Sequence, residues 1–277
     1  MKYFAALLIG LLLFSAGSAS AQRRPAREIK KVSGELYRFR DKFHYSVFLV
    51  TPAGIIATDP LNGDAAQWLK QELAKRFSQP VKYLIYSHDH ADHISGGEVF
   101  DDAALVVAHE KAKAAIIREK RPTAIPEIVF SDRMSLELGG QRVELIYVGR
   151  NHSDNSIVMR FPAQRALFAV DFIPVKSLPY QDLHDSYIEE WIESLKRVET
   201  LDFDTLVPGH GQIGQKKDVR MFRGYMAELW EEVVKYKRQG KSLDEIKQRV
   251  KMEKYQGWSQ YKTWLPMNIK GMVRQVK

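Results

Sequence analysis

The chain has 277 residues, a formal net charge of +8 and no cysteine. The absence of cysteine excludes disulfide bonds, a thiolate metal ligand and a cysteine nucleophile. The basic excess can favour acidic partners, but we expect no nucleic-acid partner because no basic and aromatic motif of a nucleic-acid-binding module is present. Composition leaves the oligomeric state open.

The first 21 residues have the pattern of a secretory signal peptide. A lysine follows the initial methionine, an apolar run covers residues 4–14, and residues 19–21 are Ala-Ser-Ala. The apolar run is shorter than the roughly 20 residues that span a bilayer, so we expect no stable membrane insertion. The prediction is a mature chain of residues 22–277 that is periplasmic or secreted.

The mature chain alternates between strand and helix signals. Runs rich in β-forming residues predict strands, and apolar residues at helical spacing predict helices. The predicted strands are residues 34–39, 44–50, 54–58, 81–86, 104–108, 127–130, 142–148, 156–161, 166–170 and 205–207, and the predicted helices are residues 62–77, 110–120 and 186–200. From residue 215 onwards the chain is predicted to be mostly helical. Two β-rich halves followed by helices indicate an α/β fold with two packed sheets and helices outside.

The strongest chemical signal is the segment Ser-His-Asp-His-Ala-Asp-His at residues 87–93, where a predicted strand ends. Side chains two residues apart on an extended segment face the same way, so His88 and His90 can bind one metal ion together. As the chain turns, Asp92 and His93 can point at a second ion. Imidazole and carboxylate groups are the expected ligands of zinc and of chemically similar divalent metals.

Three further candidate ligands also follow predicted strands. They are His152, Asp171 and His210, and the last of these lies between Gly209 and Gly211. Strand ends that converge on one edge are common positions for functional residues. The sequence therefore predicts one site with seven metal ligands.

Other polar residues receive different predictions. Lone histidines are usually surface or satisfied core residues, so we do not expect His44, His109 or His184 to bind metal. Asp89 points away from its neighbouring histidines on an extended segment, and we expect it at the surface or behind the ligands. Tyr180 belongs to a turn-rich loop that can form one wall of the site, where it can donate a hydrogen bond to substrate. The alternative is that Tyr180 only packs or faces solvent.

These motifs resemble those of the metallo-β-lactamase-fold superfamily across essentially all of the mature sequence. The matching motifs are Thr58-Asp59, residues 88–93, His152, Asp171 and residues 207–211. The resemblance implies an αββα sandwich, with two mixed sheets flanked by helices and the metals in a groove along one edge. Residues 22–277 then form the hydrolase domain, and residues 215–277 are its helical C-terminal part.

The resemblance also implies a role for each ligand. It assigns the first metal site to His88, His90 and His152, the second to Asp92, His93 and His210, the bridge to Asp171, and the orientation of the ligand loop to Asp59. The implied cofactor is a pair of zinc ions. A bridging aspartate resembles the glyoxalase II, lactonase and phosphodiesterase branches, whereas residues 151–156 resemble the lactamase-like branch.

The predicted activity is hydrolysis of a carboxylic ester, lactone or amide, including weak β-lactamase activity, by a hydroxide that bridges the two metals. Asp92 and Asp171 are the predicted catalytic ligands, because they can orient the hydroxide or pass on its proton. Two alternatives stay open: a phosphodiester or sulfate-ester hydrolase, and a sulfur dioxygenase with a single iron. The second ligand set argues against the dioxygenase. Only Arg150 and Lys176 lie beside the ligands in sequence as candidates for binding a phosphate.

Overall fold

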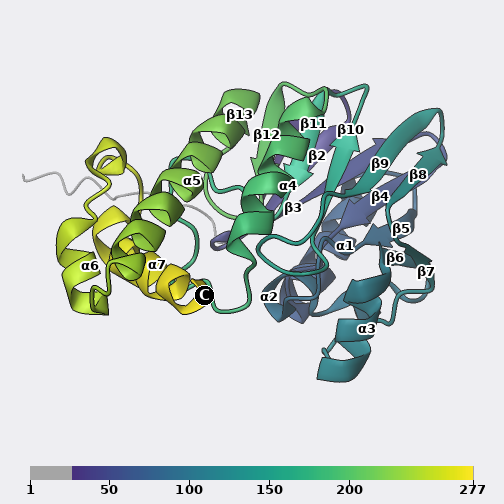
Figure 1. Cartoon of the computed structure of the whole chain (residues 1–277). Coiled ribbons are helices and arrows are strands. Elements are labelled where there is room, and N and C mark those ends of the chain that lie inside the picture. Colours follow the sequence, from purple (N-terminus) through teal and green to yellow (C-terminus); the bar gives the residue numbers. More distant parts are fainter. Residues whose placement is uncertain (1–26, 277) are drawn as a thin grey trace, which may run out of the picture.

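A computed structural model describes residues 27–276, so the predicted signal peptide lies outside the described residues. Two β-sheets pack against each other, and helices cover their outer faces (Figure 1). This arrangement confirms the predicted αββα sandwich. Among the described residues, none of the helices combines the length and the apolar character that crossing a bilayer requires.

The first sheet has seven strands, hydrogen-bonded in chain order. They are β1 (Arg27–Ser33), β2 (Leu36–Asp41), β3 (His44–Thr51), β4 (Gly54–Thr58), β5 (Val81–Ile85), β6 (Leu105–His109) and β7 (Ile128–Phe130). The strands from β1 to β4 are antiparallel, whereas those from β4 to β7 are parallel. Parallel neighbours need crossover connections. These contain α1 (Gly63–Arg76), α2 (Ala91–Ile94) with η1 (Gly97–Phe100), and α3 (Glu110–Glu119).

The second sheet has six strands in the order β13-β12-β11-β10-β9-β8. They are β8 (Arg133–Leu138), β9 (Gln141–Tyr147), β10 (Ile157–Phe161), β11 (Ala166–Ala169), β12 (Thr205–Pro208) and β13 (Gly214–Gln215). Helix α4 (Ile188–Thr200) is in the crossover between the parallel strands β11 and β12. The predicted helical end consists of α5 (Lys216–Arg238), α6 (Leu243–Arg249), η2 (Glu253–Tyr255) and α7 (Tyr261–Gln275).

Buried apolar side chains form three clusters, one for each interface between layers. Val47 and Leu49 of β3 lie in the cluster between the sheets, whereas Phe48 lies in the cluster beneath α1. This alternation follows from the strand geometry, in which successive side chains point to opposite faces. The third cluster joins the second sheet to α4, α5 and α7. Both sheets are therefore fixed from both sides, which holds their strand ends in place.

Three strands, β1, β8 and the two-residue β13, are not among the predicted ones. β1 is an edge strand in which no residue is fully buried. Its sequence, Arg-Glu-Ile-Lys-Lys-Val-Ser, is rich in charge and lacks the apolar alternation that marks a strand. β8 does alternate, with Met134, Leu136 and Leu138 on one face, and pairs with β9 as a hairpin. The other predicted strands and helices are present, with boundaries that differ by a few residues.

Replacing Phe168 by alanine tests the core between the sheets. This side chain is 1% exposed, so we expect Phe168→Ala to lower the free energy of unfolding by about 3–5 kcal/mol. Ile117→Ala is the control, because Ile117 is 54% exposed, and its effect should stay within about 0.5 kcal/mol. Urea denaturation of the metal-free chain measures both. Equal effects would contradict the assigned core.

Candidate metal centre

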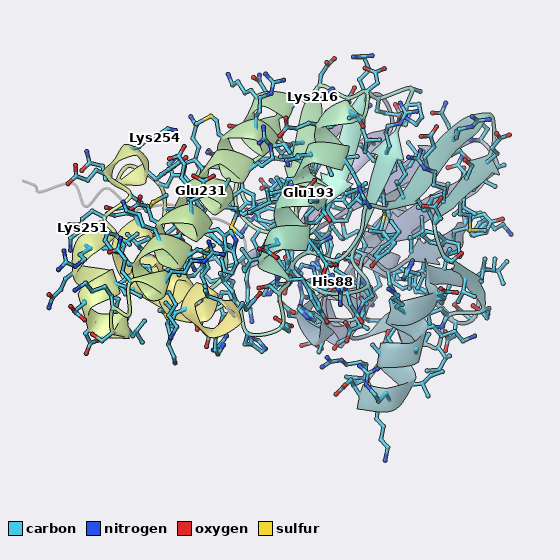
Figure 2. All side chains as sticks on the ribbon, in the orientation of Figure 1. His88, Glu193, Lys216, Glu231, Lys251 and Lys254 are labelled. Carbon is cyan, nitrogen blue, oxygen red and sulfur yellow. The ribbon has the colours of Figure 1, made fainter. Side chains whose placement is uncertain are left out.

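The seven candidate ligands meet where strands from both sheets end. Four of them follow β5, and the others are His152 after β9, Asp171 after β11 and His210 after β12. The strands β4 and β5, and likewise β11 and β12, are parallel, so the C-terminal ends within each pair lie at the same edge of their sheet. His88, labelled in Figure 2, is fully buried. The fold thus collects side chains that are more than 100 residues apart.

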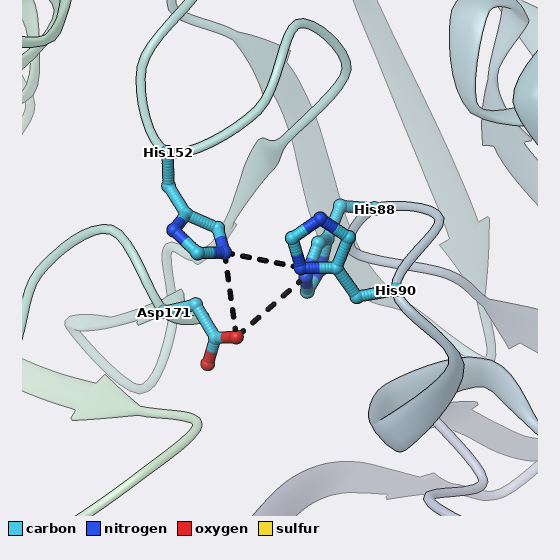
Figure 3. A group of neighbouring side chains, drawn as sticks. All are labelled: His88, His90, His152 and Asp171. Carbon is cyan, nitrogen blue, oxygen red and sulfur yellow. Dashed lines mark hydrogen bonds and ion pairs between the residues drawn. The ribbon is translucent and has the colours of Figure 1, made fainter. Parts of the chain in front are cut away.

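The first group consists of His88, His90, His152 and Asp171, whose ligand atoms all lie within 4.8 Å of one another (Figure 3). His90 Nδ1 is 3.1 Å from His152 Nε2. Asp171 Oδ2 is 3.7 Å from Nε2 of both His88 and His152. His88 Nε2 is buried and has no hydrogen-bond partner among residues 27–276. Such an unpartnered nitrogen is costly, and a cation within the group would satisfy it, so these donors fit a metal ion.

The second group consists of Asp92, His93, Asp171 and His210, again with ligand atoms within 4.8 Å. Asp171 Oδ1 is 3.1 Å from Nε2 of both His93 and His210. These two nitrogens are 3.1 Å apart. Asp171 therefore directs Oδ2 toward the first group and Oδ1 toward the second. One carboxylate shared by two donor sets is the arrangement that two neighbouring metal ions require.

Backbone geometry at two positions permits this approach. Asp171 has a φ of +61°, in the left-handed region that residues other than glycine adopt infrequently. On the opposite side, a Cβ atom at Gly209 would lie 2.5 Å from Val170 Cγ1 and 3.0 Å from His93 Cε1. Only glycine lets the end of β12 pass so close to the ligands. Gly209 therefore lets the loop that carries His210 lie against the side chain of His93.

Individual imidazoles of the site differ in protonation in the metal-free protein. Burial lowers the pKa of His152 to about 4 and that of His88 well below its usual value. Burial also acts to lower the pKa of His93, but the carboxylates of Asp171 and Asp92 outweigh it and raise this pKa to about 9. At neutral pH, His88 and His152 offer free lone pairs, whereas His93 carries a proton that a metal ion must displace.

Two buried aspartates position the ligand loop. Asp59 Oδ1 accepts a hydrogen bond from Ser87 N at 2.8 Å, which is the orienting contact that the resemblance implied. Asp89 is also buried rather than at the surface. Its carboxylate accepts hydrogen bonds from Asn155 Nδ2 at 2.8 Å and from Arg121 at 3.1 Å. Asp89 thereby joins the loop after β5 to the loop that carries His152.

Two residues without a predicted role contact the ligands. His44 Nε2 lies 3.3 Å from Asp92 Oδ2, and Asp185 Oδ2 lies 2.9 Å from His90 Nε2. No local spacing marks either residue, because both reach the site only through tertiary structure. The one available signal is the position of His44, which directly follows the tight turn between β2 and β3. Phe43 O in this turn lies 3.0 Å from His210 Nδ1, so the turn is bonded to the loop of His210.

The remaining predicted residues lie away from the two groups. His109 stacks on Tyr147 and bonds the carbonyl of Ser131, and His184 is exposed. Neither belongs to the two ligand groups found within residues 27–276. Tyr180 is 63% exposed, with its ring against Trp264 of α7 at a centroid distance of 5.4 Å. Its hydrogen bond to substrate stays a prediction.

Comparison with known proteins identifies the family. Residues 43–210, more than half of the chain, match the model of the metallo-beta-lactamase superfamily. The chain belongs to this superfamily. With its two groups of His and Asp donors, it is a metal-dependent hydrolase of the superfamily.

Individual relatives are distant. The chain is 28% identical over 207 residues to the 2,4-dinitroanisole O-demethylase subunit alpha of Nocardioides sp. (strain JS1661), covering 73% of this chain but only 62% of the relative. It is 29% identical over 174 residues to the metallo-beta-lactamase type 2 of Bacillus cereus, covering 61% of this chain and 67% of the relative. A solved metallo-beta-lactamase from Pontibacter korlensis has the same fold, with a TM-score of 0.64 and 22% identity over 73% of this chain and 99% of that chain.

The protonation of His93 makes a prediction about metal uptake. Because its pKa is about 9 in the metal-free chain, a divalent ion at the second group must displace a proton below that pH. The affinity of this group should therefore rise with pH, by about tenfold per unit for each proton displaced. Zinc calorimetry at pH 6, 7 and 8, in buffers of different ionisation enthalpy, measures both the affinity and the proton release. A second ion that binds without releasing a proton would contradict the protonated His93.

Proposed function

We propose that this chain is an exported dinuclear zinc hydrolase that cleaves a carboxylic ester, a lactone or an amide, with weak β-lactamase activity in the same range. The observation that carries the proposal is the shared carboxylate of Asp171, which faces both ligand groups at once. A donor set of imidazoles and carboxylates without thiolate suits zinc. The relatives named as metallo-beta-lactamases support a metal at this site.

Each ligand residue has a distinct role in this proposal. In this proposal, His88, His90 and His152 hold one ion, Asp92, His93 and His210 hold the other, and Asp171 binds both. A bound pair of ions supplies an activated water near neutral pH and polarises the scissile carbonyl. Asp92 is half-exposed, and its Oδ2, 3.7 Å from His93 Nε2, could orient a water molecule at the site and accept a proton from it. His44, at 3.3 Å from the same oxygen, holds this carboxylate in place.

The cations near the site favour a carbonyl substrate over a phosphodiester. A phosphodiester needs a free Arg or Lys to bind its charge. Arg121 is paired with Asp89, and Arg150 is paired with Glu190 through both ends of its guanidinium. Lys176, the other candidate from the sequence, is exposed. Because these guanidinium groups are engaged by acidic partners, they are not free to bind the charge of a phosphodiester, which supports a carbonyl substrate.

The substrate class and the metal are tested together on the full chain. We expect close to two zinc ions per chain, and a higher kcat/KM for an aryl ester, a lactone or nitrocefin than for bis(4-nitrophenyl) phosphate. A clear phosphodiester preference would reverse the substrate assignment. One tightly held iron with no zinc, found by elemental analysis, would instead favour the dioxygenase.

Asp171→Asn tests the shared ligand in the same preparation. This change keeps the side-chain shape but removes the charge that faces both groups, so both ions should bind more weakly. Loss of residues that merely support a ligand costs 10–100-fold, so kcat/KM should fall by about 100-fold or more. Asp244→Asn is the control, because this carboxylate is exposed on α6, and it should leave metal content and rate unchanged. Normal zinc content in Asp171→Asn would contradict the bridge.

Export is proposed from the sequence of residues 1–21. When the full-length chain is expressed in a bacterium with a periplasm, the product should begin at Gln22 and be released by osmotic shock. Intact-mass spectrometry of the released and membrane fractions measures this. A product that retains Met1 and stays in the membrane fraction would contradict cleavage and favour an anchor.

A further inference from the structure

The loop of residues 172–187, here called the site loop, connects Asp171 to α4 and reaches back to the first ligand group. Near its end, Asp185 Oδ2 lies 2.9 Å from His90 Nε2. The other ring nitrogen, His90 Nδ1, faces His152 Nε2 at 3.1 Å. An imidazole that donates one N–H to a carboxylate presents the lone pair of its other nitrogen to a metal. Asp185 therefore orients His90 toward the first group.

The conformation of the site loop depends on contacts from outside it. Lys176, Gln181 and Leu183 have φ angles of +49°, +37° and +54°, in the left-handed region that favours glycine. Such residues persist only where the surrounding structure holds them. The position of Asp185 therefore depends on the elements that pack against this loop.

Helix α7 provides the first set of contacts through a buried asparagine. Asn268 is fully buried, and its Nδ2 donates hydrogen bonds to the carbonyls of Pro179 at 3.1 Å and Gln181 at 2.5 Å. Its Oδ1 accepts a hydrogen bond from the Tyr225 hydroxyl of α5 at 2.7 Å. All polar groups of this side chain are thus used to join the site loop to α7 and α5.

The end of α7 provides contacts on both sides of Asp185. Arg274 donates hydrogen bonds to the carbonyl and the carboxylate of Asp182, at 2.8 Å and 3.1 Å. Gln275 Nε2 donates to the carbonyl of Ser186 at 3.0 Å. These bonds go mainly to backbone carbonyls, so they fix the path of the loop rather than the identity of its side chains.

A glycine lets α7 touch the loop directly. A Cβ atom at Gly271 would lie 2.0 Å from the carbonyl oxygen of Asp182 and 3.1 Å from Leu183 Cβ. Any larger residue at this position must displace either the helix or the loop. The contact is therefore tight enough to transmit a small shift of α7 to the segment that contains Asp185.

We propose that α7 is a positioning element of the metal centre, which holds the site loop so that Asp185 orients His90. This inference rests on the proposed metal-binding function. Helix α7 begins at Tyr261, well after residue 210, where the match to the family model ends. On this view α7, labelled in Figure 1, is part of the structure that supports the metal centre.

Gly271→Ala is the direct test, with Gly224→Ala in α5 as the matched control. A Cβ atom at Gly224 has Tyr255 Oη at 3.3 Å as its nearest neighbour, so this control is mild, and both changes favour helix formation. We expect Gly271→Ala to weaken the binding of one zinc ion by about tenfold, whereas Gly224→Ala should stay within about twofold. Gly271→Ala should also alter the visible spectrum of the cobalt(II)-loaded chain and speed amide exchange in the site loop.

A double-mutant cycle separates positioning from a general loss of structure. If α7 acts through Asp185, Gly271→Ala should change zinc affinity little in a chain that already carries Asp185→Ala. Fully additive losses would contradict the proposal. Arg274→Met removes an exposed contact of the same loop and should show the same coupling, even if Gly271→Ala fails to fold.

The outcomes distinguish this proposal from the proposed function. Two zinc ions in the wild type, bound with unchanged affinity in Gly271→Ala and Arg274→Met, would overturn the role of α7 and leave the hydrolase intact. Fewer than two ions in the wild type would instead overturn the dinuclear site. In that case ¹⁵N NMR of the metal-free chain still tests the coupling, since displacement of Asp185 must change the His90 Nε2 signal. An unchanged signal would contradict the proposal.

Discussion

A single carboxylate, that of Asp171, joins the two halves of the site. Its oxygens face different groups of imidazoles, so its position must be correct for both at once. A buried negative charge is tolerated only with close positive or hydrogen-bonding partners. His93 and His210 provide these partners in the metal-free chain and hold the pKa of Asp171 well below its usual value against the opposing effect of burial. Much of the surrounding structure keeps this side chain in place.

The layered fold meets that requirement by restraining each sheet on both faces. Asp171 leaves β11, which is buried along its whole length, and Trp191 of α4 donates a hydrogen bond to the carbonyl of Phe172, the next residue in the chain. The ligand loop after β5 is held by the hydrogen bond from Ser87 N to Asp59. Asp89 joins the same loop to Asn155, in the loop that follows β9 of the second sheet. The ligands are therefore arranged by rigid elements, with little freedom for the loops that carry them.

The sequence was sufficient for the fold class and for the seven residues that meet at the site. Strand alternation and the two-residue spacing of His88 and His90 are local patterns, which can be recognised in a single sequence. β1 was missed because an edge strand carries charge in place of apolar alternation. The contacts of Asp185 and α7 with the site were missed for a different reason. Hydrogen bonds to backbone carbonyls leave no residue signature in the loop that receives them, so Asn268 has no distinctive pattern until the fold places it.

The position of α7 in the sequence gives the site an order of assembly. All seven ligands precede residue 211, so a chain that emerges from its N-terminus presents the whole donor set before α7 exists. A metal ion that arrived at that stage would meet a His90 not yet oriented by Asp185. On the proposed role of α7, a chain that stops before this helix would collect its seven ligands yet hold its first ion only loosely.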